Sequence, residues 1–196
     1  MSFPIDIIIR TLGNKNYCIF RNGSVNLVGI RNPNRTSNYF DDILYCFRFV
    51  NNECLINEYA MTTDPGAYWL ENPMRVEGTA ILKEGQYLGL WYLSTYGRGY
   101  PHLKQKGICT VYRDNNRDKI INLNADNLHT GNFGIELHRS GKGQTEAIDR
   151  WSAGCQVFQD NSQYDNDFIL GIIKDADKYG NSFTYTLINA EELVLI

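Results

Sequence analysis

Short runs of aromatic and β-branched residues, each ended by a turn sequence, fill most of this chain and most constrain how it can fold. The turns include Asn22-Gly23, Asn51-Asn52 and Asp64-Pro65-Gly66. Thirteen Tyr and nine Phe favour strands, and the many Gly, Asn and Asp favour tight turns between them. Because the turns recur without a fixed repeat, we expect one mainly β domain without internal duplication or a linker.

Helices are expected only near the two ends. Near the start, apolar residues recur at helical spacing from Ile5 to Leu12. Near the other end, a helix is predicted from Gln163 to Lys178, with Gly180 ending it.

Strands are predicted between these helices and after the second one. The Asn-Gly pair at residues 22–23 predicts a hairpin, and a second hairpin is expected around Asn51 and Asn52. Residues 122–132 are expected to be irregular. The predicted strands cover residues 17–20, 25–30, 42–49, 53–61, 67–70, 85–93, 107–112 and 183–189.

Composition limits the partners and the compartment. The net charge of −3 gives no electrostatic reason to expect nucleic acid. No apolar stretch approaches the ~20 residues that span a bilayer, and the first residues do not resemble a secretory signal. We therefore expect synthesis in the cytoplasm without an export signal of the chain's own.

The five cysteines are odd in number and form no CxxC pair, which suits a reducing compartment better than disulfides or a zinc cluster. Four of them are expected to be ordinary core residues, and the exception is Cys155. No cofactor is predicted.

The stretch from Gly134 to Phe158 is where we expect chemistry. His138 alternates with Ile135 and Leu137, so a strand would place its imidazole on the face opposite the apolar residues. Cys155 follows seventeen positions later, after Ser152, Ala153 and Gly154. A thiolate is a nucleophile, and a nearby imidazole can generate it. The alternatives are a buried structural cysteine and a surface strand histidine.

Other residue types near the motif have open interpretations. Backbone N–H groups at Gly154 and Cys155 are candidates for an oxyanion hole, and Ser152 for bracing the turn. Trp151 could line a groove or belong to the core. His129 could complete a metal set with His138 and Cys155, although the spacing matches no familiar zinc motif. His102 is expected at the surface.

The pattern of His138, a loop and Ser152-Ala153-Gly154-Cys155 resembles the signature of the L,D-transpeptidase catalytic domain, a family of cysteine enzymes acting on bacterial peptidoglycan stem peptides. Residues 63–68, Thr-Asp-Pro-Gly-Ala-Tyr, look like the family's Thr-Pro-x-Gly-x-aromatic segment with the proline displaced by one. The predicted final helix and strand follow the family's order. The likeness covers residues 62–196 of a single domain, 1–196. Residues 1–61 have no counterpart and are expected to extend the sheet or to cover the groove.

The resemblance implies a mainly β, α+β fold of the β-sandwich type with mixed sheets and about two helices. The chain departs from the family at Ala153, where His or Thr is common, at Val157, where arginine is common, and at Arg139-Ser140, where Gly-Thr is common. Arg139 or Arg150 could replace the missing arginine and pair with stem-peptide carboxylates, or both could simply be solvated.

The expected function is that of a peptidoglycan-directed cysteine acyl-enzyme with Cys155 as nucleophile and His138 as base. Hydrolysis by an L,D-carboxypeptidase or endopeptidase remains an alternative to transfer. A second alternative is a non-catalytic binding or structural module of a virion or effector complex. The style of the motif is similar to that of phage-encoded and prophage-like relatives, and action in the periplasm or cell wall would need delivery by another route.

Overall fold

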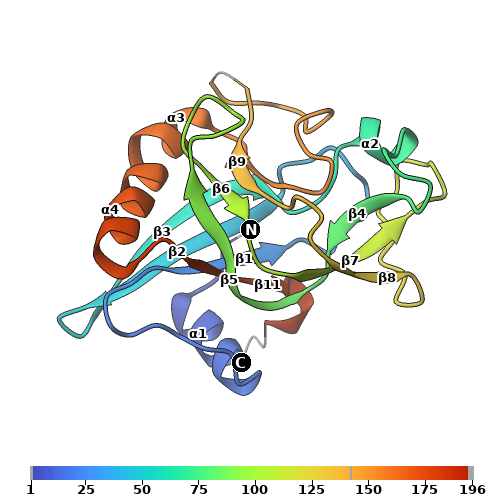
Figure 1. The fold of residues 1–196 in the computed structure, drawn as a ribbon. Coiled ribbons are helices and arrows are strands. Elements are labelled where there is room, and N and C mark those ends of the chain that lie inside the picture. The colour runs from blue at the N-terminus through green and yellow to red at the C-terminus, as the bar shows by residue number, and fades with distance from the viewer. Residues whose placement is uncertain (1, 142, 194–196) are drawn as a thin grey trace.

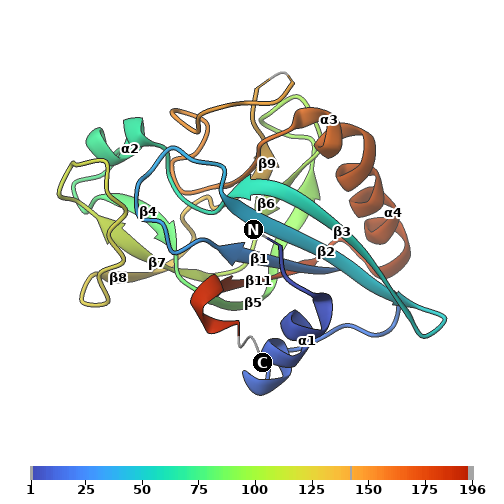
Figure 2. The ribbon, with the colours of Figure 1, turned by 180° about the vertical axis from the view of Figure 1, so that it is seen from behind.

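The computed structural model describes residues 2–141 and 143–193 and shows a mainly β architecture (Figure 1). In these residues, eight strands close into a barrel in the order β1-β11-β5-β6-β9-β10-β3-β2, and three more form a small sheet, β4-β7-β8. Figures 1 and 2 show the small sheet and helix α2 at one side of the barrel and helix α4 at the other. The expected mainly β class is confirmed, but the larger sheet is closed rather than one layer of a sandwich.

The barrel strands are short apart from β2, β3 and β5. They are β1 (Asn26–Arg31), β2 (Asp42–Val50), β3 (Glu53–Thr62), β5 (Gly85–Ser94), β6 (His102–Gln105), β9 (Leu137–Arg139), β10 (Gln156–Phe158) and β11 (Phe183–Asn189). The small sheet contains β4 (Thr79–Leu82), β7 (Cys109–Asp114) and β8 (Leu128–Gly131). The neighbours β1 and β11 run parallel, as do β9 and β10, and the other ladders are antiparallel.

The helices at both ends were predicted from the sequence. Helix α1 (Ile5–Asn14) packs its apolar face, including Ile8 and Leu12, on the outside of β1, β2 and β11. The C-terminal helical run comprises α3 (Asn161–Gln163), a π-helical turn η1 (Tyr164–Phe168) and α4 (Ile169–Tyr179). Gly180 ends α4, as predicted. Among the described residues, no helix is both long and apolar enough to cross a membrane.

Two further helical pieces complete the chain, α2 (Ala67–Glu71) and the 3-10 turn η2 (Ala190–Glu192). The prediction of a strand at residues 67–70 is therefore wrong. The Gly66 carbonyl accepts hydrogen bonds from the N–H groups of both Trp69 and Leu70, which starts a helical turn. Two helices were expected, and α2 is an addition.

The second predicted hairpin is confirmed. β2 and β3 pair from Val50↔Glu53 to Asp42↔Met61, and Figure 2 shows the long hairpin extending past the barrel. Asn51 and Asn52 have φ angles of 51° and 67°, which is the left-handed geometry that a two-residue hairpin turn requires.

The hairpin predicted around Asn22-Gly23 is wrong. Both edges of β1 are occupied, one by β2 and the other by β11, so residues 17–20 have no free edge to pair with. Instead, the backbone of Phe20 exchanges hydrogen bonds with the Asn26 side chain.

Four strands were missed. β4 and β6 have four residues each, β10 has three, and β8 lies in the stretch expected to be irregular. The predicted cysteine environments are also partly wrong, because Cys18 is exposed, Cys46 and Cys54 are half-buried and only Cys109 is buried.

An aromatic cluster fixes β10, the strand that follows Cys155. The Phe158 ring centroid lies 4.7 Å from that of Phe168, 5.0 Å from that of Tyr164 and 5.1 Å from that of Tyr59. Pairs at such distances stabilise by about 0.5–1.5 kcal/mol each beyond the apolar area they bury. The cluster packs the C-terminal helical run against β3 and β10 and so fixes the strand that follows Cys155.

Candidate active site

Cys155 stands at the end of a tight turn, directly before β10. The Ser152 hydroxyl accepts a hydrogen bond from the Gly154 N–H at 3.1 Å and donates one to the Cys155 carbonyl at 2.8 Å. Gly154 has a φ of 118°, and a Cβ atom there would overlap the Ala80 carbonyl oxygen. Glycine is thus needed both for the backbone angle and for the space, and Ser152 holds the turn closed.

The Cys155 thiol is half-buried and protonated at neutral pH. Its Sγ atom lies 3.5 Å from the Gly134 carbonyl oxygen, to which it donates a hydrogen bond. Burial raises the pKa of the thiol to about 11, against the opposing effects of the Glu136 backbone N–H and the positive charge of Arg98. The resting group is a thiol and not a thiolate.

His138 is fully buried on β9, beside β10. Its Nδ1 lies 2.8 Å from the Arg139 carbonyl oxygen. Because a carbonyl only accepts, Nδ1 carries the hydrogen and Nε2 keeps a lone pair. Burial, assisted by the charge of Arg98, lowers the pKa of His138 to about 3, so the imidazole is neutral. Nε2 is buried and has no hydrogen-bond partner among the described residues.

The structure places the two candidate catalytic residues on neighbouring segments without a hydrogen bond between them. The parallel register pairs Val157 with His138 and Gln156 with Leu137, so Cys155 lies beside Glu136. Side chains alternate along each strand, which puts Cys155, Glu136 and His138 on one face. The imidazole and the thiol each use other partners or none.

The two predicted oxyanion donors differ. The Gly154 N–H is occupied by Ser152, whereas the Cys155 N–H has no hydrogen-bond partner within the described ranges. Only the Cys155 N–H is therefore free to bind a developing negative charge in this conformation.

Sequence reasoning missed a charged group beside the thiol. Arg98 forms an ion pair with Glu136 at 2.7 Å, and the charges of both act on the pKa of Cys155. His102 is buried, with Nε2 3.9 Å from a Glu136 carboxylate oxygen, so the surface assignment was wrong. The strand alternation that identified His138 also places Glu136 on the same face, so Glu136 could have been predicted from the sequence. No local sequence pattern predicts that Arg98, which lies between Gly97 and Gly99, belongs to the site.

Of the predicted substrate-binding residues, Arg139 is the last residue of β9, and Arg150 and Trp151 lie on the loop between β9 and Cys155. Arg139 stacks on Tyr100, with 4.2 Å from Cζ to the ring centroid, and pairs with Asp165 at 3.1 Å. Arg150 is exposed. Trp151 is 46% exposed. Arg150 has no acidic partner among the described residues but stacks on Tyr68, with 3.9 Å from its Cζ to the ring centroid, whereas Arg139 has an acidic partner already.

His129 lies on β8 of the small sheet, apart from the strand ladder that carries His138. In the part of the chain that the structure describes, no group of three or more His, Cys, Asp or Glu side chains could hold a metal ion.

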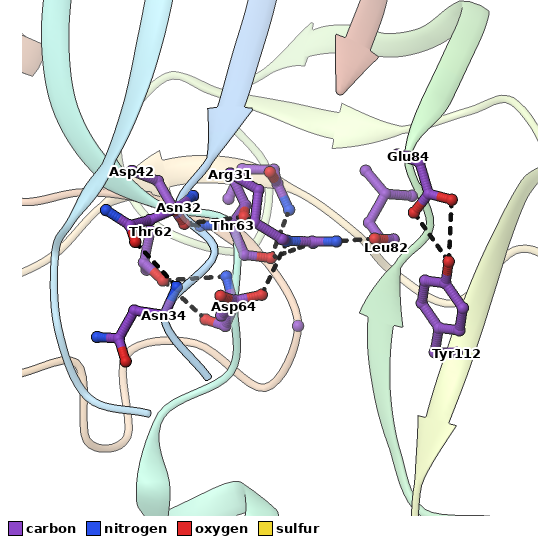
Figure 3. A network of polar contacts seen from close by, with 12 residues as sticks. Arg31, Asn32, Asn34, Asp42, Thr62, Thr63, Asp64, Leu82, Glu84 and Tyr112 are labelled. Carbon is purple, nitrogen blue, oxygen red and sulfur yellow. Dashed lines mark hydrogen bonds and ion pairs between the residues drawn. The ribbon is translucent and has the colours of Figure 1, made fainter. Parts of the chain in front are cut away.

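A buried polar network joins Arg31 on β1 to Thr63, Asp64 and Leu82 (Figure 3). The Arg31 guanidinium donates through Nη2 to the carbonyls of Thr63, at 3.1 Å, and Leu82, at 2.9 Å. The same Thr63 carbonyl accepts from Gln156 Nε2 at 3.4 Å, and Gln156 Oε1 accepts from Tyr185 at 2.8 Å. The residue after Cys155 is thereby fixed to β1, β4 and β11 through the barrel interior.

Comparison with known proteins gives no match, whether with protein-family models, with curated proteins or with solved structures.

Proposed function

We propose that this protein is an L,D-transpeptidase-like cysteine acyl-enzyme that acts on peptidoglycan stem peptides, with Cys155 as nucleophile and His138 as base. One observation carries the proposal. A turn that requires Gly154 and is braced by Ser152 presents a cysteine beside a strand whose histidine is neutral and has an unused Nε2 lone pair. The sequence resemblance, and not the barrel, supplies the substrate class.

The neutral pair defines the order of events. Cys155 leaves the Gly134 carbonyl, and His138 Nε2 takes the thiol proton while Sγ attacks a peptide carbonyl. The Cys155 N–H binds the oxyanion. His138 then returns the proton to the leaving amine, and an acyl-enzyme forms. A second amine completes transfer, or water completes hydrolysis. Arg150 and Trp151, and Arg139 if it leaves Asp165, are proposed to contact the peptide.

The second candidate is a non-catalytic binding module with the same core. The hydrogen bond from Cys155 to Gly134 and the pKa of about 11 favour it, because a structural cysteine has these properties.

Covalent labelling separates the two functions. The protein is incubated with a carbapenem near pH 7, and intact mass and peptide mapping locate the adduct. We expect one adduct on Cys155, and we expect His138→Gln to slow its formation by about 100-fold or more, the usual range for loss of a general base. Cys18→Ser is the matched control, because Cys18 is exposed and distant from Cys155 in the sequence. Equal labelling of Cys18 and Cys155, or no effect of His138→Gln, would refute catalysis.

Transfer and hydrolysis are separated by mass spectrometry of muropeptides incubated with the protein. Crosslinked dimers indicate transfer, and shortened stems indicate hydrolysis. Neither product should form with Cys155→Ser.

A further inference from the structure

A pocket of about 130 Å³ lies beside the Cys155 turn. Its walls include Trp69, Arg75, Arg113, Phe133 and Ala153. Ala153 belongs to the turn itself, and Phe133 precedes the glycine whose carbonyl accepts the Cys155 thiol. The pocket is therefore bounded by both segments that flank the nucleophile.

One wall carries a buried cation with an unsatisfied donor. Arg113 is only 7% exposed. Its Nη1 donates to the Gly78 carbonyl at 3.0 Å, and its Cζ lies 4.8 Å from the Phe133 ring centroid. Its Nε is buried and has no hydrogen-bond partner among the described residues. A buried donor on a charged group is costly when unpaired, which points to an acceptor supplied from outside the chain.

The charges around Arg113 indicate the charge that this acceptor should carry. Burial is the largest cause of the lowered pKa of Arg113, the charge of Glu77 opposes it, and Arg75, an exposed residue of the same pocket, adds a smaller lowering by repulsion. Two guanidinium groups against one carboxylate leave the pocket positive. A planar anion that accepts two parallel hydrogen bonds suits this geometry, and a carboxylate is such a group.

We infer that this pocket binds the carboxylate of a short peptide, with the adjoining apolar side chain against Trp69 and Phe133. That the peptide is the enzyme's substrate rests on the proposed function, whereas binding itself does not need Cys155. The apolar walls select an organic carboxylate over a bare inorganic anion.

The test is a titration of the whole protein with N-acetyl-D-alanyl-D-alanine, followed in ¹H–¹⁵N spectra. Its C-terminal amide and inorganic phosphate are the comparison ligands. We expect the acid to move the Arg113 Nε–H resonance downfield, and the amide and phosphate to bind at least tenfold more weakly. Arg113→Gln should weaken binding of the acid about tenfold, as for loss of a charge-assisted hydrogen bond.

Arg75→Gln is the second variant, because Arg75 is exposed and its replacement leaves the core untouched. It should weaken binding severalfold, while Arg117→Gln, an exposed change outside the pocket, should have no effect. Equal binding of acid and amide, phosphate binding as tight as the acid, or unchanged binding in both pocket variants would overturn the inference. Cys155→Ser should still bind the acid. Binding of the acid without carbapenem labelling would support the pocket inference and reject the acyl-enzyme. Labelling of Cys155 without binding of the acid would support the acyl-enzyme and reject the pocket inference.

Discussion

Replacing Gly154 by alanine should show how tightly the Cys155 turn is constrained. The φ of 118° is unfavourable for any residue with a Cβ and costs about 1–3 kcal/mol. The new Cβ would also overlap the Ala80 carbonyl oxygen, and relieving such an overlap adds about 1–3 kcal/mol. Gly154→Ala should therefore lower the free energy of unfolding by about 2–6 kcal/mol in total.

Gly180→Ala is the matched control. Gly180 has a φ of 97°, and a Cβ there would meet no atom within 4 Å, so this variant carries the backbone strain without the overlap. The reduced entropy of the unfolded chain is common to both changes and cancels in the comparison.

Urea titration of both variants measures the difference, which should be about 1–3 kcal/mol and shift the midpoint by roughly 0.5–1.5 M at an m-value near 2 kcal/mol/M. Carbapenem labelling of Gly154→Ala should slow as well, since the turn must move from Ala80 and carry Cys155 with it. Equal stability of the two variants would show that the turn is not held against β4, and the reasoning would fail.

Two further predictions concern protonation. Alkylation of Cys155 by iodoacetamide should rise about tenfold per pH unit between about pH 7 and 10, because burial raises the pKa of the thiol to about 11; a plateau below about pH 8 would contradict this. Burial and the charge of Asp64 raise the pKa of Asp42 from 3.8 to about 7, so the folded state binds this proton more tightly than the unfolded chain does. The free energy of unfolding should then fall as the pH rises from about 4 to 7, and Asp42→Asn should flatten this pH dependence in urea titrations. A wild-type stability that rises over this range relative to that of Asp42→Asn would contradict the sign.

Elements whose information is local were predictable. The β2–β3 hairpin, β5, β11 and the two terminal helices each contain a period or a turn signal within their own residues. β6 and β10 have four and three residues and exist because neighbours on both sides complete their ladders. No short window of sequence contains those partners. The same cause explains the failed prediction for residues 17–20, where the strand-like composition is present but the edge of β1 is occupied.

The residues of the candidate site also divide into those that local sequence predicts and those that only the fold brings together. Residue identities at Ser152, Gly154, Cys155 and His138 follow from local spacing, and the structure places Ser152 and Gly154 where a constrained turn needs them. Arg98, which sits between Gly97 and Gly99, affects the pKa values of both His138 and Cys155 through folding alone.

Protonation is the property that sequence could least supply, and it determines how such a site would work. A preformed thiolate and imidazolium pair would need an elevated histidine pKa and a depressed thiol pKa, whereas burial shifts both in the opposite directions here. Proton transfer before attack is therefore unfavourable, and the thiol must lose its proton as Sγ bonds to the carbonyl. That requirement makes the free Nε2 of His138, and not a reactive resting thiolate, the feature on which the proposed catalysis depends.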